Sequence, residues 1–493
     1  MRHGKWIAAP LVALAVSVFA SADVSAESYL YTRGNEAVEA PSAYTVSREI
    51  PLEADGVKAV SPQDIFYSDS GKFYIVDTNN DRILIYDSDY EQVDVLSSFA
   101  LPDGTVTTLH VPEGIYVDED ETLYIADTGN NRILKCDSQG NVLLQIEKPE
   151  NLTGVSADSA FNPIKLSVDT SGRIYVVARN YNLGILQLDA GGSFVGYMGA
   201  PKVQYNIVQM LWRRFSTQEQ LAKMEQYVPT EYNNIAIDEE GFVYGTIGTL
   251  DAQKMETAIS SHDTSGSVTP IKKLNTMGSD VLKRNGFCAP MGDLEYETEC
   301  SKIVDVAYTA AGMYAMLDAA HGHIFVYDSN GNLLCAFGGS TTGDGFARVS
   351  SFTYAGDSLL VLDAQAAKMF VYEPTTYGRM VFDAVSAQYN GDFDEAYALW
   401  SDVAACNRNF EYAFVGLGQS YLSDGQYEQA MECFRLTDDK ENYSRAKQLL
   451  RKENMKTVFP VIFILILCIV SLLTVWRFGK KVYRYVKGEV EGS

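Results

Sequence analysis

Short apolar strands separated by acidic turns recur through the middle of the chain. Each unit has an acidic turn with Gly, an apolar strand that carries Tyr, a polar turn, a second strand and another acidic turn. The pattern is clearest in YSDSGKFYIVDTNNDRILIYDSDY and VDEDETLYIADTGNNRILKCDSQG, where Tyr74 and Tyr124 hold the same place. Short apolar runs bounded by turn residues are typical of β-strands. The repetition therefore predicts an array of small sheets.

Six units align on one anchor position, and their spacing sets the architecture. The anchors are Tyr74, Tyr124, Tyr175, Tyr244, Tyr314 and Leu360. Successive spacings are 50, 51, 69, 70 and 46 residues. A small sheet cannot bury both faces alone, so neighbouring units must stack around an axis. We predict a mainly β protein with a six-bladed β-propeller over residues 27–376. A seventh blade would have to lie within one of the two long intervals.

The motif Tyr-Ile-x-Asp-x-x-x-x-Arg-Ile occurs in the first two units at equal spacing. In this motif, and over about residues 58–375, the chain resembles the NHL-repeat family of β-propellers. The resemblance implies a recognition platform, and anchored bacterial members look like accessory components of membrane transport systems, including ABC-type systems that handle sugars. Some six-bladed relatives are metal-dependent lactonases or lyases with ligands at the central channel, so the resemblance also implies an enzymatic alternative.

The acidic and basic residues of the motif recur with it. Asp77 and Arg82 reappear as Asp127 and Arg132. Such pairs look catalytic, but a group repeated in several blades usually serves the blade, so we interpret them as structural. The Asp-rich turns at 87–89 and 118–120 are interpreted as hairpin turns. Calcium binding is the alternative, because carboxylate oxygens suit that ion.

The stretch AYTVSREI at residues 43–50 alternates like a strand. The last unit ends soon after Tyr372, so this stretch is predicted to supply its missing outer strand and remove a free sheet edge. The alternative is an unpaired N-terminal segment.

From about residue 379 the period changes to 34 residues. Three pairs of positions recur at that distance: Gly391 and Gly425, Ala396 and Ala430, Trp400 and Phe434. The shared core G-x-[FY]-x-x-A-x-x-x-[WF] resembles tetratricopeptide (TPR) repeats over residues 379–452. In this interpretation the small residues permit close helix packing and the two aromatic rings fill the gaps.

The sequences of the two chain ends predict export and a membrane anchor. Residues 1–26 have a basic start, an apolar run and small residues, which is typical of a signal peptide, with an uncleaved anchor as the alternative. Residues 458–476 contain no charge and would span about 28 Å as a helix, which predicts a transmembrane segment rather than a buried core helix. The basic tail at 477–493 is then cytoplasmic and the bulk extracytoplasmic. Low cysteine use favours a bacterial origin.

Charge and histidine content narrow the partners and cofactors. The formal net charge is −25, so the chain has no basic field to attract nucleic acid. Only five histidines occur, which disfavours a multi-histidine metal site. His321 and His323 lie two apart in the fifth unit and are candidates for half of a divalent metal site. The alternative is that both are solvated turn residues.

The insertions carry the remaining candidates. Trp212, Arg213, Arg214 and Phe215 form a basic and aromatic cluster that would suit an anionic ligand, a carbohydrate or a partner protein. The alternative is a flap clamped to the acidic propeller by its own charges. Cys288 and Cys300 lie in one irregular segment and could form a disulfide in an oxidising compartment.

Together these features favour a single-pass, extracytoplasmic binding or scaffold protein with a protein partner in a membrane complex. The enzymatic alternative is a lactonase or lyase, although the chain lacks a P-loop, a G-x-S-x-G elbow and an H-E-x-x-H motif.

Overall fold

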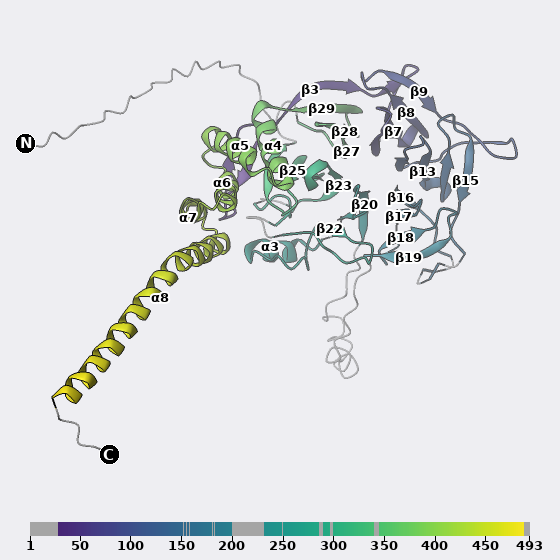
Figure 1. Ribbon diagram of the computed structural model, residues 1–493. Coiled ribbons are helices and arrows are strands. Elements are labelled where there is room, and N and C mark those ends of the chain that lie inside the picture. The colour runs from purple at the N-terminus through teal and green to yellow at the C-terminus, as the bar shows by residue number, and fades with distance from the viewer. Residues whose placement is uncertain are drawn as a thin grey trace, which may run out of the picture.

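The computed structural model describes residues 28–487, apart from 151, 154, 157, 180, 182, 200–230, 249, 285–288, 296–298 and 340–344. Six antiparallel sheets stand side by side around one axis and form a ring (Figure 1). Helices follow the ring, and the last of them is long and apolar. The predicted mainly β fold with six blades, C-terminal helices and one apolar helix is therefore confirmed.

Each blade is a meander whose strands pair in chain order, from the axis outward. Blade one contains β6 (Asp64–Tyr67), β7 (Phe73–Asp77), β8 (Arg82–Tyr86) and β9 (Gln92–Leu96). Blade two contains β12 (Gly114–Val117), β13 (Leu123–Asp127), β14 (Arg132–Cys136) and β15 (Val142–Ile146). Blade three contains β16 (Pro163–Val168), β17 (Ile174–Ala178), β18 (Ile185–Leu188) and β19 (Phe194–Met198).

The second half of the ring is less regular. Among the described residues, blade four contains β20 (Tyr232–Ile237), β21 (Val243–Ile247) and β22 (Ile271–Leu274). Blade five contains β23 (Ile303–Tyr308), β24 (Tyr314–Asp318), β25 (His323–Tyr327) and β26 (Leu333–Gly338). Blade six contains β27 (Val349–Ala355), β28 (Ser358–Asp363) and β29 (Lys368–Pro374). The innermost strands β6, β12, β16, β20, β23 and β27 contact their neighbours in ring order, so they surround the axis.

Short elements occupy the connections between the strands. The strands β4 (Glu53–Ala54), β5 (Val57–Lys58), β10 (Phe99–Ala100) and β11 (Val106–Thr107) lie between blades. The helix α3 (Ala252–Ser260) and the 3₁₀ turns η1 (Thr78–Asn80), η2 (Thr128–Asn130) and η3 (Ala310–Gly312) each connect two strands of one blade. The helix α3 and strand β22 both come from the long interval between the fourth and fifth anchors.

The N-terminal segment pairs with the last two blades. Strand β3 (Tyr44–Pro51) pairs antiparallel with β29 and becomes the outer strand of blade six, so the stretch 43–50 lies at the ring closure. Before it, β1 (Tyr29–Tyr31) and β2 (Ala37–Glu39) extend blade five beyond β26. Chain segments about 300 residues apart are thereby joined by backbone hydrogen bonds.

Four helices form two antiparallel pairs after blade six. They are α4 (Thr376–Asn390), α5 (Phe393–Cys406), α6 (Glu411–Ser423) and α7 (Tyr427–Leu436). Trp400 and Phe434 are fully buried, and the backbone of α6 approaches them at Gly416 and Gly418. A Cβ added at either glycine would come within 2.6 Å of the facing ring. Of the residues that recur every 34 positions, Trp400 and Phe434 therefore lie at this close helix contact, and Gly391 and Gly425 have positive φ just after a helix.

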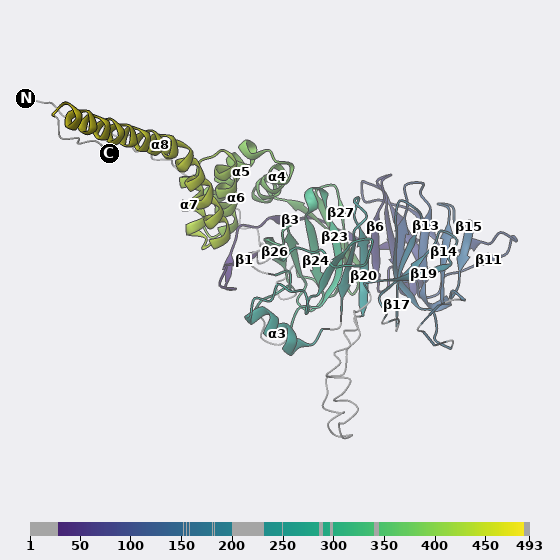
Figure 2. The ribbon, with the colours of Figure 1, turned by 60° about the horizontal axis from the view of Figure 1, so that its bottom comes forward.

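The helical pairs and the propeller share one hydrophobic core. The ring of Tyr44 lies 5.0 Å from the ring of Phe337 in blade five and 5.4 Å from that of Phe382 in α4. The Tyr412 hydroxyl donates to Asp328 Oδ2 at 2.5 Å, in the turn between β25 and β26. Figure 2 shows the helices lying against the side of the ring formed by blades five and six.

The helix α8 (Lys440–Val486) projects away from this body in both views (Figures 1 and 2). Among the described residues it is the helix long and apolar enough to cross a membrane. It joins the end of the expected repeat region and the expected span in one continuous element.

The contact between α4 and the closing strand generates a test. A Cβ at Gly378 would lie 2.1 Å from the carbonyl oxygen of Ala43. We expect Gly378→Ala to push α4 away from β3 and to lower the free energy of unfolding by about 1–3 kcal/mol, measured by denaturant unfolding of the full chain in detergent. Gly479→Ala is the matched control, since nothing lies within 4 Å of its Cβ. Equal midpoints for the two variants would contradict the packing described here.

Candidate functional site

The innermost strands bring one residue per blade to an equivalent position at the axis. These residues are Asp64, Gly114, Lys165, Asn234, Asp305 and Ser351. Each pairs with the residue at the same step of the second strand of its blade, for example Asp64 with Val76 and Asp305 with Leu317. Five of them carry polar side chains that meet, and we call Asp64, Lys165, Asn234, Asp305 and Ser351 the axial cluster.

Direct contacts link these side chains across the ring. Lys165 Nζ lies 2.5 Å from Asp64 Oδ1. Ser351 Oγ lies 2.6 Å from Asp305 Oδ2 and 3.1 Å from Asp64 Oδ1. Asn234 Nδ2 donates to Asp305 Oδ1 at 2.7 Å. Backbone N–H groups of Ile115 and Phe352 also donate to the two carboxylates. Blades one, two, three, four, five and six are all joined by this network.

Burial governs the electrostatics of the axial cluster. It raises the pKa of Asp305 to about 6, although the nearby Lys165 ammonium acts in the opposite direction. Burial also opposes the charge on Lys165, but the carboxylates of Asp64 and Asp305 outweigh it and raise the pKa of this amine. The positive charge at the axis therefore comes from a lysine of the chain itself.

The repeated Asp and Arg residues lie on the second and third strands of their blades. Arg82 Nε donates to Asp77 Oδ2 at 2.7 Å, and Arg132 Nε donates to Asp127 Oδ2 at the same distance. The other oxygen of each aspartate accepts a backbone N–H from the preceding connection, at Val60 and His110. All four charged side chains are buried. Buried pairs of this kind fit the interpretation that these residues stabilise the blade.

The Asp-rich turns have a local role. Asp87 Oδ1 accepts the backbone N–H groups of Asp89 and Glu91, and Asp118 Oδ1 accepts those of Asp120 and Thr122. These carboxylates close hairpin turns in the way that Asp commonly does.

Blade five carries histidines at positions that hold other residues in blades one and two. The residue opposite Asp77 is Arg82 and the residue opposite Asp127 is Arg132. Opposite Asp318 stands His323, because Leu317 pairs with Ile324. His321 likewise occupies the place of Asn80 and Asn130, which donate to the aspartate of their own blades.

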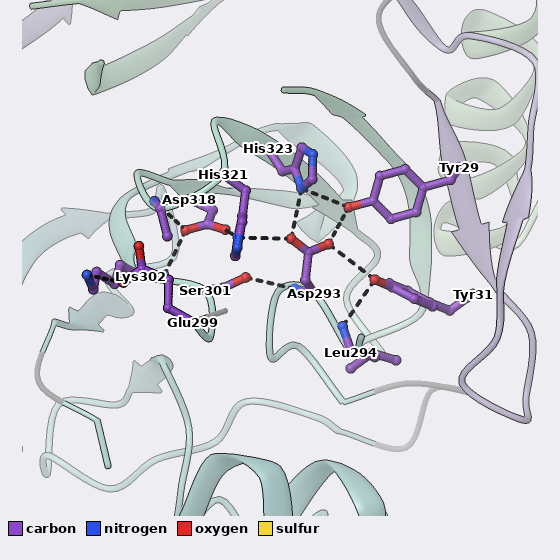
Figure 3. A network of polar contacts seen from close by, with 11 residues as sticks. Tyr29, Tyr31, Asp293, Leu294, Glu299, Ser301, Lys302, Asp318, His321 and His323 are labelled. Carbon is purple, nitrogen blue, oxygen red and sulfur yellow. Dashed lines mark hydrogen bonds and ion pairs between the residues drawn. The ribbon is translucent and has the colours of Figure 1, made fainter. Parts of the chain in front are cut away.

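These histidines converge on two carboxylates (Figure 3). His321 Nδ1 lies 2.8 Å from Asp318 Oδ2 and 3.2 Å from Asp293 Oδ2. His323 Nδ1 lies 2.8 Å from the same Asp293 oxygen. Asp293 comes from the irregular segment before blade five. We call Asp293, Asp318, His321 and His323 the histidine cluster; their ligand atoms lie within 4.8 Å of one another.

Surrounding groups fix the orientation of both carboxylates. The hydroxyls of Tyr29 and Tyr31 donate to Asp293 Oδ1, and burial is the main cause that raises the pKa of both phenols. Backbone N–H groups of Lys302 and Ala320 donate to Asp318 Oδ1 at 2.7 and 2.9 Å. The hydrogen bond with Asp318 raises the pKa of His321. This cluster of nitrogen and oxygen donors is a candidate divalent metal site.

The remaining predicted residues lie elsewhere. Trp212, Arg213, Arg214 and Phe215 lie outside the described residues, as does Cys288. Cys300 is buried, and its bond with Cys288 stays a prediction. Neither the axial cluster nor Asp293 is indicated by the sequence pattern.

A family model described as SMP-30/Gluconolactonase/LRE-like region matches residues 65–157. These residues span most of blade one and all of blade two. The chain thus contains a six-bladed propeller, of which blades one and two are similar to this family. A search of curated proteins finds no significant match.

Solved propeller structures are similar at low identity. Virginiamycin B lyase from Staphylococcus aureus is 11% identical, with a TM-score of 0.41, over 67% of this chain and 100% of the lyase. A streptogramin B lyase is 13% identical, with a TM-score of 0.39, over 68% of this chain and 100% of that chain.

The raised pKa of Asp305 predicts a pH effect on stability. The folded value of about 6 exceeds the usual 3.8, so its stabilising contribution is complete at low pH and is lost as the pH rises through 6. We expect the free energy of unfolding of the native-sequence chain, relative to Asp305→Asn, to fall by about 2 kcal/mol between pH 4 and pH 7.

Denaturant unfolding of both chains in detergent at several pH values measures this difference. Asp357→Asn is the control, because Asp357 is exposed in the turn between β27 and β28. A difference between native sequence and D305N that stays constant with pH would contradict the assignment.

Proposed function

We propose that the protein is a single-pass membrane protein whose propeller and helical pairs form an extracytoplasmic binding platform. The observation that carries this proposal is the apolar segment of α8. Its consecutive side chains are exposed on every face, with relative exposures of 48–63% from Phe459 to Ile464. An isolated helix of about 28 Å with apolar side chains all round is stable when lipid covers it.

The ends of this segment support a membrane position. Lys480 Nζ lies 5.0 Å from the centre of the Trp476 ring, which is a pairing that suits the boundary between lipid and water. The expected signal peptide at 1–26 and the basic tail at 477–493 support export of the bulk and a cytoplasmic C-terminus. The two helical pairs, interpreted as TPR-like over 379–452, would add a second recognition surface next to the propeller.

The axis of the propeller supports binding over catalysis there. The enzymes implied by the NHL resemblance use ligands that converge on the central channel. Here the innermost strands hold the Lys165 ammonium beside the carboxylates of Asp64 and Asp305, which also accept backbone N–H groups. Recognition would then use the outer surfaces and the insertions of the propeller. The partner would be a protein of a membrane complex that transports sugars, and a carbohydrate would be a further ligand.

One observation favours the alternative, a metal-dependent lactonase or lyase. The histidine cluster brings together two imidazoles and two carboxylates. Among the described residues, it is the group of His, Cys, Asp or Glu side chains that could hold a metal ion. Its residues lie on the second strand (Asp318), on the third strand (His323) and in the turn between them (His321), and in the insertion before blade five, rather than in the axial cluster. A protein that purifies alone, carries a metal and turns over lactones would support this alternative.

The proposed topology predicts how cysteines react in cells. Cys406 is exposed at the end of α5, and position 479 lies in the basic tail. We expect a membrane-impermeant maleimide to modify Cys406 in intact cells, with the site identified by mass spectrometry. In the C406S/G479C chain we expect modification of position 479 only after permeabilisation. Labelling of position 479, but not Cys406, in intact cells would reverse the orientation and defeat the proposal.

The platform role predicts a stable partner. We expect the full chain, solubilised in mild detergent without crosslinking, to co-purify with a component of a transport or envelope complex. If the basic and aromatic cluster at residues 212–215 contacts this partner, the triple variant W212A/R213A/R214A should no longer co-purify with the partner. The control R435A removes an exposed arginine of α7 and should retain the partner. Purification of the chain alone from its native membrane would count against a platform.

A further inference from the structure

The charge balance of blade five differs from that of the blades it repeats. In blades one and two a buried aspartate faces a guanidinium, so each pair is neutral. In blade five the guanidinium is replaced by the His323 imidazole, and a second carboxylate, Asp293, is added. Within the described residues, no lysine or arginine forms an ion pair with Asp293 or Asp318; Lys302 pairs with Glu299. Two carboxylates therefore face two imidazoles with no fixed positive charge.

The geometry of the four groups is that of a ligand set. One oxygen of each carboxylate is already occupied, Asp293 Oδ1 by the two tyrosine hydroxyls and Asp318 Oδ1 by two backbone N–H groups. The second oxygen of Asp293 lies 3.2 Å from His321 Nδ1 and 2.8 Å from His323 Nδ1, and the second oxygen of Asp318 lies 2.8 Å from His321 Nδ1. The Tyr29 hydroxyl also lies 3.0 Å from His323 Nδ1. A tetrahedral zinc ion with bonds of about 2.0–2.1 Å needs donor atoms about 3.4 Å apart. The three close pairs would have to open by about 0.2–0.6 Å to reach this separation, and the other pairs, which lie within 4.8 Å, would have to adjust to it.

We propose that Asp293, Asp318, His321 and His323 bind one divalent ion of the zinc class. A dication would neutralise the two carboxylates with both histidines uncharged. Imidazole nitrogens favour zinc and similar transition metals, whereas calcium takes six to eight oxygen ligands. Hydrogen bonds that hold the other oxygen of each carboxylate, as here, are typical of metal sites. Four protein ligands leave no open position, so the ion has a structural role.

The ion would connect three segments of the chain. Asp293 belongs to the insertion before blade five, the histidines and Asp318 belong to the blade, and Tyr29 and Tyr31 bring β1 to the same carboxylate. Its binding would lock the N-terminal strand and the insertion onto blade five. This proposal is independent of the platform role, since it concerns how β1 and the insertion are held on blade five.

Metal binding by the full chain tests the proposal. The detergent-solubilised protein is stripped with chelator, dialysed against zinc or cobalt, and analysed by elemental mass spectrometry. We expect one equivalent of zinc per chain, a visible cobalt spectrum of tetrahedral intensity, and a zinc-dependent rise in the thermal midpoint. Binding of neither zinc nor cobalt would overturn the proposal and leave the cluster balanced by protons.

The decisive variant is H321N/H323R, because it restores the Asn and Arg that stand at these places in blades one and two. We expect it to fold without metal, to lose the cobalt spectrum, and to bind zinc at least tenfold more weakly. The control H110Q/H262Q removes the two other exported histidines and should retain one equivalent. Zinc binding by H321N/H323R as tight as that of the native sequence would also overturn the proposal.

Discussion

The ion pair between Lys165 and Asp64, with Asp305 beside it, is the constraint at the centre of the ring. Three charged groups are held here with little access to water. Burying charges is costly unless each has a partner and its remaining hydrogen bonds are made. The backbone N–H groups of Ile115 and Phe352 and the side chains of Asn234 and Ser351 complete those bonds. Only a ring with its blades in place supplies all of these partners together.

Ring closure depends on the ends of the propeller in the same way. Strand β3 completes blade six, and the same segment carries Tyr44 into the core shared with α4. A movement of β3 would thus disturb both the last blade and the first helical pair. This coupling makes the helices a part of the closed ring rather than an appendage, and it places the start of α8 at a fixed point on the body.

The blades repeat a backbone and vary its chemistry. Asp77 with Arg82, Asp127 with Arg132, and Asp318 with His323 occupy matching positions. In the first two blades the pair joins a turn to the preceding connection. In blade five the same geometry, with one more carboxylate from an insertion, brings together a candidate set of metal-ligand atoms. A repeated scaffold therefore allows one blade to acquire a new site without altering its strands.

The sequence predicted features that depend on local repetition. The Tyr, Asp and Arg positions recur because every blade must bury the same faces and close the same turns, and this periodicity was enough to predict six blades. The axial residues stand ten positions before Tyr74, Tyr124, Tyr175 and Tyr244, so alignment of the anchors marks their place. They escaped the pattern because Asp64, Gly114, Lys165 and Asn234 differ in chemistry; they complement one another instead of repeating.

The contact between Tyr29 and Asp293 had no such signal. It joins residues 264 positions apart, one in a three-residue strand and the other in an irregular insertion. Periodicity reports which face of an element is buried, but it does not report which distant loop meets that face. His321 and His323 could be recognised as a pair in the sequence. Asp293, the carboxylate that joins them in the candidate ligand set, is identified only from the fold, which places the insertion against blade five.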